Sequence, residues 1–331
     1  MGSEIILRPY QFCNLTEVVV RANDTFESLQ RKVRLATILG TIQATYTRFP
    51  YLRDIWRANT EEERLLGVSL TGIMDSKVLA NKYLFEEEFN HFYGDNEKEF
   101  NTFQLEEVLS KLKNVAIDTN KVWADRLGIP QSTAITCVKP SGTVSQLVDS
   151  ASGIHPRHSE FYIRTVRGDN KDPLTKFMVA QGIPAKPDVM KPDTTTVFSF
   201  PVKAPEGAIT RKNLTAIDQL ELWLTYQRFW CEHKPSITVN VRNDEWLEVG
   251  AWVYKHFDEV SGISFLPYSD HTYQQAPYQE ISKATYEEAL AVMPTKIDWS
   301  LLSEFEKKDN TVSSQTYACT GDTCEIVDIS V

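Results

Sequence analysis

A short polar stretch in the middle of the chain has the residue types that bind phosphate. It reads Cys137-Val138-Lys139-Pro140-Ser141-Gly142-Thr143-Val144-Ser145, and apolar residues lie on both sides of it. Pro140 fixes one backbone torsion and Gly142 permits a close bend, so a tight turn is expected. The hydroxyls of Ser141, Thr143 and Ser145, with nearby backbone N–H groups, can converge on a phosphate. An ordinary strand-to-helix turn is the alternative, and the Gly-Lys-Ser/Thr of P-loop proteins is absent.

Two cysteines near the C-terminus, Cys319 and Cys324, have a spacing that suits thiol exchange. They flank a glycine in a C-x₄-C arrangement and follow a charged and small polar segment, residues 306–316. This composition predicts a redox-active dithiol on a flexible arm. A fortuitous pair and a zinc site are the alternatives, and zinc would need two further ligands at metal-ligand spacing, which the sequence lacks. Cys137 and Cys231 are interpreted as buried small hydrophobic residues.

Composition and charge limit the classes of function. The chain has 331 residues, of which 42% are hydrophobic, so it can bury a large core. A net charge of −10 disfavours nonspecific binding to nucleic acid or to an anionic membrane. The sequence contains neither a long apolar run nor a signal peptide, and we expect a cytoplasmic protein. Five cysteines are too few for a disulfide scaffold in a chain of this length.

The elements that must position these residues alternate regularly between strand and helix. Buried strands are expected near Cys13, Leu66, Ile135, Thr238 and Ile263. Helices are expected at residues 26–47, 101–128, 215–232 and 245–260. In the first, the apolar residues that recur at helical spacing are Leu35, Ile38, Leu39, Ile42 and Tyr46. In the last, the residues expected to point inward are Trp246, Val249, Val253 and Phe257. Residues 161–167 suggest another strand, residues 172–182 a helix begun by Pro173, and residues 184–205 a surface excursion with a β-prone run. The alternation predicts a parallel α/β architecture.

Several spaced motifs resemble one enzyme family. They are Ser3-Glu4-Ile5-Ile6, Phe12-Cys13-Asn14-Leu15, Val138 to Ser145, and Cys319 with Cys324, supported by Phe161-Tyr162-Ile163-Arg164, Cys231-Glu232-His233, Ser236-Ile237-Thr238-Val239, Ser264-Phe265-Leu266-Pro267 and Asp270-His271-Thr272-Tyr273. In this order they resemble the C-terminal half of a class II, adenosylcobalamin-dependent ribonucleotide reductase of the monomeric triphosphate-reductase type. The resemblance covers essentially the whole chain.

The resemblance implies a role for each of the residues that match. Glu4 would be the acid–base carboxylate that acts on the ribose 3′-hydroxyl, which helps to expel the 2′-hydroxyl as water. Cys13 would be one of the two cysteines that supply reducing equivalents. Residues 140–145 would hold the substrate phosphates, and Cys319 with Cys324 would reduce the active-site disulfide and be reduced in turn by a thioredoxin-like partner. Without the resemblance, Glu4 would be interpreted as an exposed terminal carboxylate and Cys13 as a core thiol.

The resemblance also implies an architecture and a missing part. The family has a ten-stranded α/β barrel, and the strands counted here would form its second five-stranded half, over residues 1–305, followed by the flexible redox tail, residues 306–331. The radical cysteine of the Asn-Pro-Cys motif has no counterpart before Ser3, so we expect the chain to act with an N-terminal half and to be inactive alone. Met1-Gly2 would then be an expression scar or a natural split, such as an intein junction before Ser3.

Two other readings of the chain remain open. A class I large-chain fragment would pass a radical through a tyrosine pair, and the sequence has no Tyr-Tyr dipeptide. A noncatalytic module that binds nucleotide or thioredoxin is the alternative from a different class. A ribonucleoside di- or triphosphate substrate is expected in the enzymatic readings, and adenosylcobalamin as cofactor in the class II reading.

Overall fold

The computed structural model describes residues 4–80, 92, 105–268 and 274–307. Among these residues, 4–157 and 205–268 form one compact unit, and 158–204 with 274–307 form another. The motif residues of the first unit include Glu4, Cys13 and the turn at residues 140–145. The predicted tail begins at the last described residues, so Cys319 and Cys324 lie outside the described part of the chain.

Parallel strands form the centre of the first unit. β1 (Asn14–Val19), β2 (Leu66–Thr71) and β3 (Thr136–Cys137) pair in this order, and β7 (Ile237–Val241) pairs with β8 (Ile263–Pro267). A parallel bridge between Val138 and Pro235 joins the two groups, and Ser236 N donates to Val138 O at 2.9 Å. The five parallel strands predicted from the sequence are therefore confirmed, in the order β1-β2-β3-β7-β8. Closure into a barrel remains a prediction.

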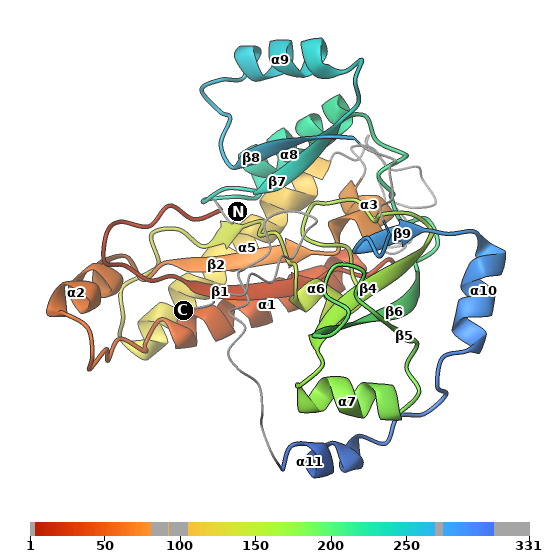
Figure 1. The fold of residues 1–331 in the computed structure, drawn as a ribbon. Helices are drawn as coiled ribbons and strands as arrows, with labels where there is room; N and C mark the ends of the chain where they lie inside the picture. Colours follow the sequence, from red (N-terminus) through yellow and green to blue (C-terminus); the bar gives the residue numbers. More distant parts are fainter. Residues whose placement is uncertain (1–3, 81–91, 93–104, 269–273, 308–331) are drawn as a thin grey trace. The chain divides into compact units, whose positions relative to one another are not determined.

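Helices cover one face of this sheet because that face is apolar. α1 (Phe26–Gln43) runs along β1 and β2 (Figure 1), and α5 (Leu105–Leu127) packs against α1. Thr25 caps α1 through a capping box with Ser28, and Gly128 ends α5 with a φ of 67°. The further helical segments of this unit are α2 (Asp54–Glu63), η1 (Ile73–Asp75), α3 (Lys77–Ala80), α6 (Val144–Leu147), α8 (Ala216–Phe229) and α9 (Trp246–Lys255).

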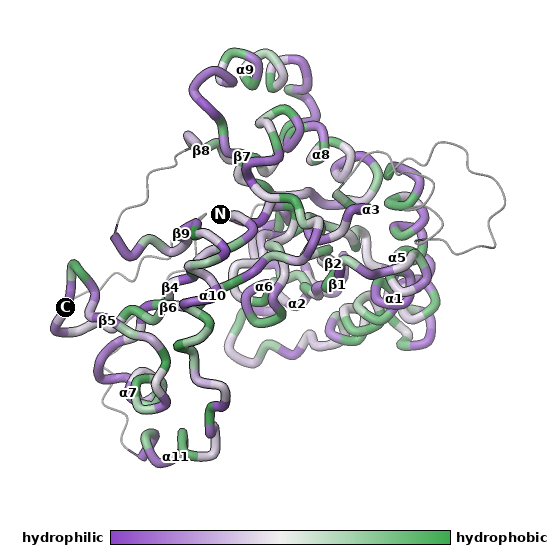
Figure 2. The backbone as a smooth tube through the Cα atoms, turned by 90° about the vertical axis from the view of Figure 1, so that its right-hand side faces the viewer, coloured by the Kyte–Doolittle hydropathy of each residue, from purple (hydrophilic) through white to green (hydrophobic). Residues whose placement is uncertain are grey.

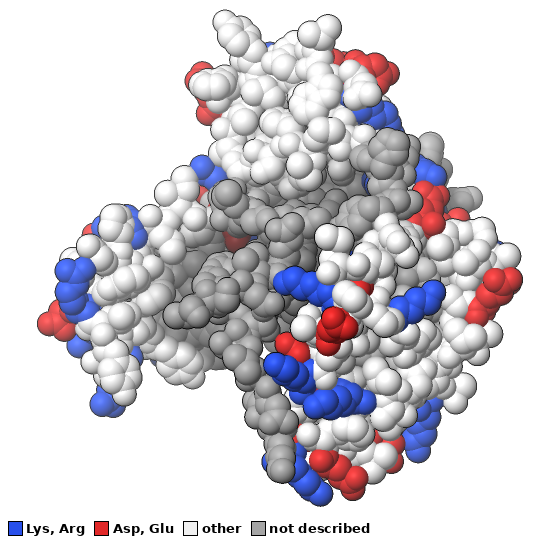
Figure 3. Space-filling view, in the orientation of Figure 1, with Lys and Arg blue, Asp and Glu red and all other residues white. Residues whose placement is uncertain are grey.

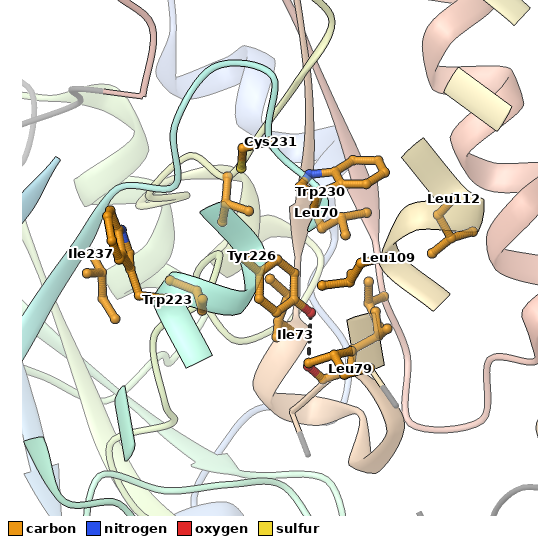
Figure 4. Close-up of a cluster of buried hydrophobic side chains, with 14 of the residues drawn as sticks. Leu70, Ile73, Leu79, Leu109, Leu112, Trp223, Tyr226, Trp230, Cys231 and Ile237 are labelled. Atoms are coloured by element: carbon orange, nitrogen blue, oxygen red, sulfur yellow. Dashed lines mark hydrogen bonds between the residues drawn. The ribbon is translucent and has the colours of Figure 1, made fainter. Parts of the chain in front are cut away.

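Aromatic residues of α8 and the loop that follows it anchor the core to the strands. Trp223, Tyr226 and Trp230 are fully buried and belong to the same hydrophobic core as Leu70 of β2, Leu109 of α5 and Ile237 of β7 (Figure 4). Each of their polar atoms has a backbone partner: Trp223 Nε1 donates to Pro235 O at 2.7 Å, Trp230 Nε1 to Cys137 O at 2.8 Å, and the Tyr226 hydroxyl to Leu79 O at 2.9 Å. The aromatic rings therefore add apolar burial without leaving buried donors unpaired.

Two helices are buried along faces that the sequence pattern did not indicate. In α1 the buried positions are Leu29, Val33, Ala36, Thr37, Gly40 and Thr41, whereas Leu35, Leu39 and Tyr46 are 56%, 53% and 71% exposed. In α9 the prediction that Trp246 and Phe257 point inward was wrong, because Val249 and Trp252 make the buried contacts. Figure 2 shows hydrophobic and hydrophilic positions intermixed along α9. Ala36, Thr37, Gly40 and Thr41 allow the second half of α1 to approach the sheet closely, and Leu35 and Leu39 face outward.

The second unit is built on an antiparallel sheet. Its strands are β4 (Phe161–Asp169), β5 (Ala185–Pro187), β6 (Thr195–Lys203) and β9 (Tyr278–Glu280), in the order β5-β6-β4-β9. Its helical segments are α7 (Pro173–Ala180), α10 (Lys283–Ala291), η2 (Trp299–Leu301) and α11 (Leu302–Phe305). The β-prone run is confirmed as β6, but β6 is an internal strand with buried Val197 and Phe198, so the prediction of a surface excursion was wrong. None of the described helices is long and apolar enough to cross a membrane.

Candidate active site

The second face of the parallel sheet carries small and polar side chains. Along β2, Leu66, Val68 and Leu70 belong to the hydrophobic core, and Gly67, Ser69 and Thr71 alternate with them. The register places Glu17 of β1, Ser69 and Cys137 of β3 side by side. At Gly67 a Cβ atom would lie 2.3 Å from Leu15 Cδ2 and 2.8 Å from Ile5 Cδ1. Glycine at this position therefore lets the segment next to Glu4 lie directly on the sheet.

Polar side chains of this face anchor the segment that follows β3. Ser69 Oγ accepts a hydrogen bond from Lys139 N at 2.8 Å. Thr71 Oγ1 accepts from Gly153 N at 2.9 Å and donates to Ala151 O at 3.1 Å. β2 thus holds both ends of the segment that contains the predicted phosphate turn.

A buried ion pair between Asp75 and Arg157 holds the C-terminal part of the same segment. Asp75 and Arg157 are 2% and 5% exposed, and two hydrogen bonds of 2.8 and 2.9 Å join the carboxylate to the guanidinium. The same carboxylate accepts from Ala151 N at 2.8 Å, and the guanidinium also bonds Asp149 at 3.0 Å. Because a planar guanidinium paired in this way has little freedom, the segment is held rigidly.

The predicted phosphate turn uses its serines internally and exposes its tip. The Ser141 hydroxyl donates to Glu17 Oε2 at 2.7 Å, and its Oγ accepts from Ser145 N at 3.1 Å. The Ser145 hydroxyl donates to Ser141 O, and both serines are buried. Gly142, Thr143 and Val144 are exposed, and their amides have no acceptor among the described residues. Three successive backbone N–H groups without an acceptor in the described ranges are available as donors to an anion.

Glu4 lies buried next to the thiol groups of this face. Its side chain is 7% exposed, so the reading of an exposed terminal carboxylate does not hold. Its carboxylate oxygen Oε2 is buried and has no hydrogen-bond partner in the described part of the chain. The backbone carbonyl of Glu4 accepts from Lys234 N at 3.0 Å, which fixes the residue to the loop before β7. A buried carboxylate oxygen without a partner is costly, and a ligand hydroxyl would satisfy it.

The thiols near Glu4 are held in the protonated form. Burial, and then the charge of Glu4, raise the pKa of the Cys13 thiol. Burial raises the pKa of the Cys137 thiol well above its ordinary value, and Glu4 adds to this effect. Cys137 and Cys231 are buried, as predicted, and Cys13 is partly exposed. Cys13 is therefore the accessible thiol of the three and is neutral at physiological pH.

The structure brings together some residues that sequence reasoning missed. Glu17 and Lys139 lie beside the turn, with Oε1 and Nζ 3.5 Å apart. His233 lies near Glu4, its Nε2 is 2.6 Å from Leu66 O, and burial lowers its pKa. The only sequence signal for Glu17 is a charged residue at an alternating position within a strand.

A cavity in the same unit has a different character. It lies between the end of α1 and the start of α2, has a volume of about 380 Å³, and is lined by Arg48, Arg53, Arg57 and Glu61 among others. Figure 3 shows acidic and basic side chains close together over α2. Arg57 pairs with Glu61 at 3.1 Å, and Arg53 stacks over the Tyr10 ring. None of the residues that the sequence motifs single out lines this cavity.

Comparisons with known proteins identify the fold and the relatives. A crystal structure of a B12-dependent (class II) ribonucleotide reductase matches with a TM-score of 0.73 and 23% identity, over 93% of this chain and 44% of that one. The fold of this chain is therefore similar to that of the matching part of a class II ribonucleotide reductase.

Sequence relatives agree with this fold. The adenosylcobalamin-dependent ribonucleoside-triphosphate reductase of Euglena gracilis is 29% identical over 96% of this chain and 40% of its own length. The enzyme of the same name from Lactobacillus acidophilus is 26% identical over 98% of this chain and 44% of its own length. No family model matches the chain. The chain is a homologue of the adenosylcobalamin-dependent ribonucleoside-triphosphate reductases, which confirms the resemblance, and it spans about two-fifths of their length.

Proposed function

We propose that this chain is the C-terminal part of an adenosylcobalamin-dependent ribonucleotide reductase and acts together with an N-terminal part. It binds the phosphates of a ribonucleoside triphosphate at residues 140–145 and supplies Glu4 and Cys13 to the reaction. The relatives are named as triphosphate reductases, which favours that substrate over a diphosphate. The proposal rests above all on one observation: Glu4, a buried carboxylate with an unpartnered oxygen, and the exposed amides of the turn belong to the same unit.

The chemistry assigns a separate task to each group. Glu4 accepts the proton of the ribose 3′-hydroxyl, and the 2′-hydroxyl leaves as water. The Cys13 thiol and a second thiol, from the N-terminal part, give up two hydrogen atoms and become a disulfide, so one ribonucleotide and two thiols yield one deoxyribonucleotide, one disulfide and water. A neutral Cys13 suits this role because it carries the hydrogen that the product needs. Adenosylcobalamin supplies the initial radical, and the residues described here serve the nucleotide.

The phosphate turn binds through its backbone. The Ser141 hydroxyl is engaged with Glu17 and the Ser145 hydroxyl with Ser141 O. The amides of residues 142–144 and the exposed Thr143 hydroxyl are therefore the groups that bind the phosphate. Ser141 and Ser145 shape the turn, and Pro140 begins it.

The C-terminal dithiol completes the cycle. Cys319 and Cys324 reduce the disulfide that contains Cys13 by thiol exchange, and a thioredoxin-like protein reduces them in turn. Cys319→Ser should abolish turnover driven by thioredoxin and retain a single turnover of the prereduced enzyme. Unimpaired thioredoxin-driven turnover in this variant would remove the tail from the pathway.

The test is deoxynucleotide formation by the chain combined with a polypeptide that corresponds to the N-terminal part of the relatives. With adenosylcobalamin, CTP and a dithiol, we expect dCTP from the combination and none from the chain alone. Cys13→Ser should yield no product with any reductant, and Cys231→Ser, which alters a buried core thiol, should retain activity. Product from the chain alone, or normal activity in Cys13→Ser, would overturn the proposal. Cobalamin binding by the combination distinguishes it from a class I fragment and from a noncatalytic module.

A further inference from the structure

One carboxylate of the sheet connects β1 to the phosphate turn. The Glu17 side chain is 10% exposed. Its neighbours in β1, Thr16 and Val18, face the helices, so Glu17 faces the opposite side of the sheet. Its Oε2 accepts from the Ser141 hydroxyl at 2.7 Å, and its Oε1 lies 3.5 Å from Lys139 Nζ. A single side chain therefore holds residues on both sides of Pro140.

The contact with Ser141 extends into the tip of the turn. Ser141 Oγ donates to Glu17 and at the same time accepts from Ser145 N at 3.1 Å, so the orientation of the hydroxyl is set by the carboxylate. Ser141 N donates to Ser152 Oγ at 2.8 Å, which fixes the backbone on the other side. The exposed residues 142–144 are bracketed by these bonds. If the carboxylate is removed, the hydroxyl can rotate away from Ser145 N and the tip loses a constraint.

The charge of Glu17 has the wrong sign for a phosphate site. A carboxylate close to a bound polyphosphate repels it, and Lys139, which is one-third exposed, offsets this only in part. A role in electrostatic attraction is therefore excluded for Glu17, and its contribution to binding must come through the geometry of the turn.

We propose that Glu17 is a positioning residue for phosphate binding: it preorganises the amides of residues 142–144 through Ser141. The inference rests on the proposed function, because it requires that the turn binds phosphate. Its signature is a difference between two substitutions. Glu17→Gln keeps an acceptor for the Ser141 hydroxyl and removes the charge, whereas Glu17→Ala removes both.

The chain contains a matched control in the connection between β1 and α1. Asp24 is also buried, accepts from the Ser28 hydroxyl at 2.6 Å, and pairs with Lys32 Nζ at 2.6 Å. Asp24 also accepts from Arg21 N at 2.8 Å, and the Arg21 guanidinium donates to Val148 O and Asp149 O. Asp24→Ala thus removes a carboxylate from a serine and a lysine, and none of its side-chain hydrogen bonds among the described residues reaches residues 140–145. Any effect of general destabilisation should occur in this variant as well.

The experiment measures binding of inorganic tripolyphosphate to the full chain by calorimetry, and amide exchange of Ser145 without ligand. We expect Glu17→Ala to weaken binding at least about fivefold, the order of one hydrogen bond, and to accelerate exchange of the Ser145 amide. Glu17→Gln should bind as well as the unaltered chain or better, and Asp24→Ala should leave both readouts unchanged.

Two outcomes would overturn the inference, and a third bears on the function. Tighter binding in both Glu17 variants would mean that only the charge matters. Unchanged exchange of the Ser145 amide in Glu17→Ala would mean that the carboxylate does not order the turn. If the unaltered chain does not bind tripolyphosphate, the proposed phosphate site is wrong and the inference is wrong with it. The exchange data then show only whether Glu17 orders a turn that does not bind phosphate.

Discussion

Leu66, Val68 and Leu70 on one side of β2 are buried against helices, whereas Gly67, Ser69 and Thr71 on the other side are equally buried against loops. The first side is stabilised by apolar burial, which is non-directional. The second side is held by hydrogen bonds, which have defined distances and angles. The helix side therefore supplies stability, and the loop side fixes the position of the turn. Substitutions on the two sides should therefore have different consequences.

The largest effect is expected for Glu4 on the loop side. Glu4→Gln keeps the shape of the side chain and removes the base, so the combined enzyme should lose about 10²–10⁴-fold in the rate of dCTP formation. Glu221, which accepts from Trp252 Nε1 at 2.7 Å on the helix side, provides the control. Steady-state assays of Glu4→Gln and Glu221→Gln measure the contrast. Equal rates in the two variants would contradict an acid–base role for Glu4.

The next largest effects are expected on β2, where substitutions on the two sides should differ in their effect on phosphate binding. Leu70→Ala should lower the free energy of unfolding by about 2–5 kcal/mol, because Leu70 is fully buried in the core. Ser69→Ala should cost about 1–3 kcal/mol, because Lys139 N loses its acceptor, and should also weaken phosphate binding. Urea unfolding and tripolyphosphate titration of both variants test this. The division between the two sides breaks down if Leu70→Ala alters affinity in the folded chain or Ser69→Ala does not.

A smaller effect is expected at Gly67, where the absence of a side chain lets the segment next to Glu4 lie on the sheet. In Gly67→Ala the new Cβ would meet the ends of Leu15 and Ile5, both flexible side chains. We expect a loss of about 1–3 kcal/mol in the free energy of unfolding from overpacking, together with displacement of Glu4. Gly250→Ala in α9 is a suitable control, since nothing lies within 4 Å of a Cβ there. A crystal structure of Gly67→Ala with Glu4 unmoved would show that the glycine is not needed to seat that segment.

The smallest effect concerns the pH dependence of Cys13. Because burial raises the pKa of this thiol, the native chain keeps the proton at pH values where the unfolded chain begins to lose it. Its contribution to stability is therefore present at neutral pH and falls as the pH rises through the pKa of the folded thiol. Alkylation of Cys13 by iodoacetamide, followed by peptide mass spectrometry, should require a more alkaline pH in the native chain than in urea. Equal pH profiles in the two states would contradict the raised pKa.

The order of elements could be predicted from the sequence, because each strand has a distinct apolar run and each long helix a recognisable boundary. Thr215 with Asp218 predicts the start of α8, and Gly128 the end of α5, from local chemistry alone. The buried side of α1 could not be predicted, because Ala36, Thr37, Gly40 and Thr41 are buried along its second half while Leu35 and Leu39 are exposed. The antiparallel unit was also missed, because β4 pairs with β6 more than 25 residues away and no local signal encodes that pairing.

The candidate site was predictable only where residue types carry the chemistry. The turn at residues 140–145 and the matching positions Glu4 and Cys13 follow from motifs. The hydrogen bond from Ser141 to Glu17 joins side chains more than 120 residues apart in the sequence. This bond decides which hydroxyl and amide groups of the turn are available to a ligand. Such contacts are set by strand order and register, which a sequence motif does not contain.

The central claim is that the loop side of the parallel sheet binds the nucleotide. Titration of the ¹⁵N-labelled chain with CTP, followed by amide chemical shifts, tests this claim most directly. We expect saturable shifts at Gly142, Thr143 and Val144, with no comparable changes in α1 or in the arginine-lined cavity beside α2. Saturable shifts confined to that cavity or to α1, with residues 142–144 unaffected, would contradict it.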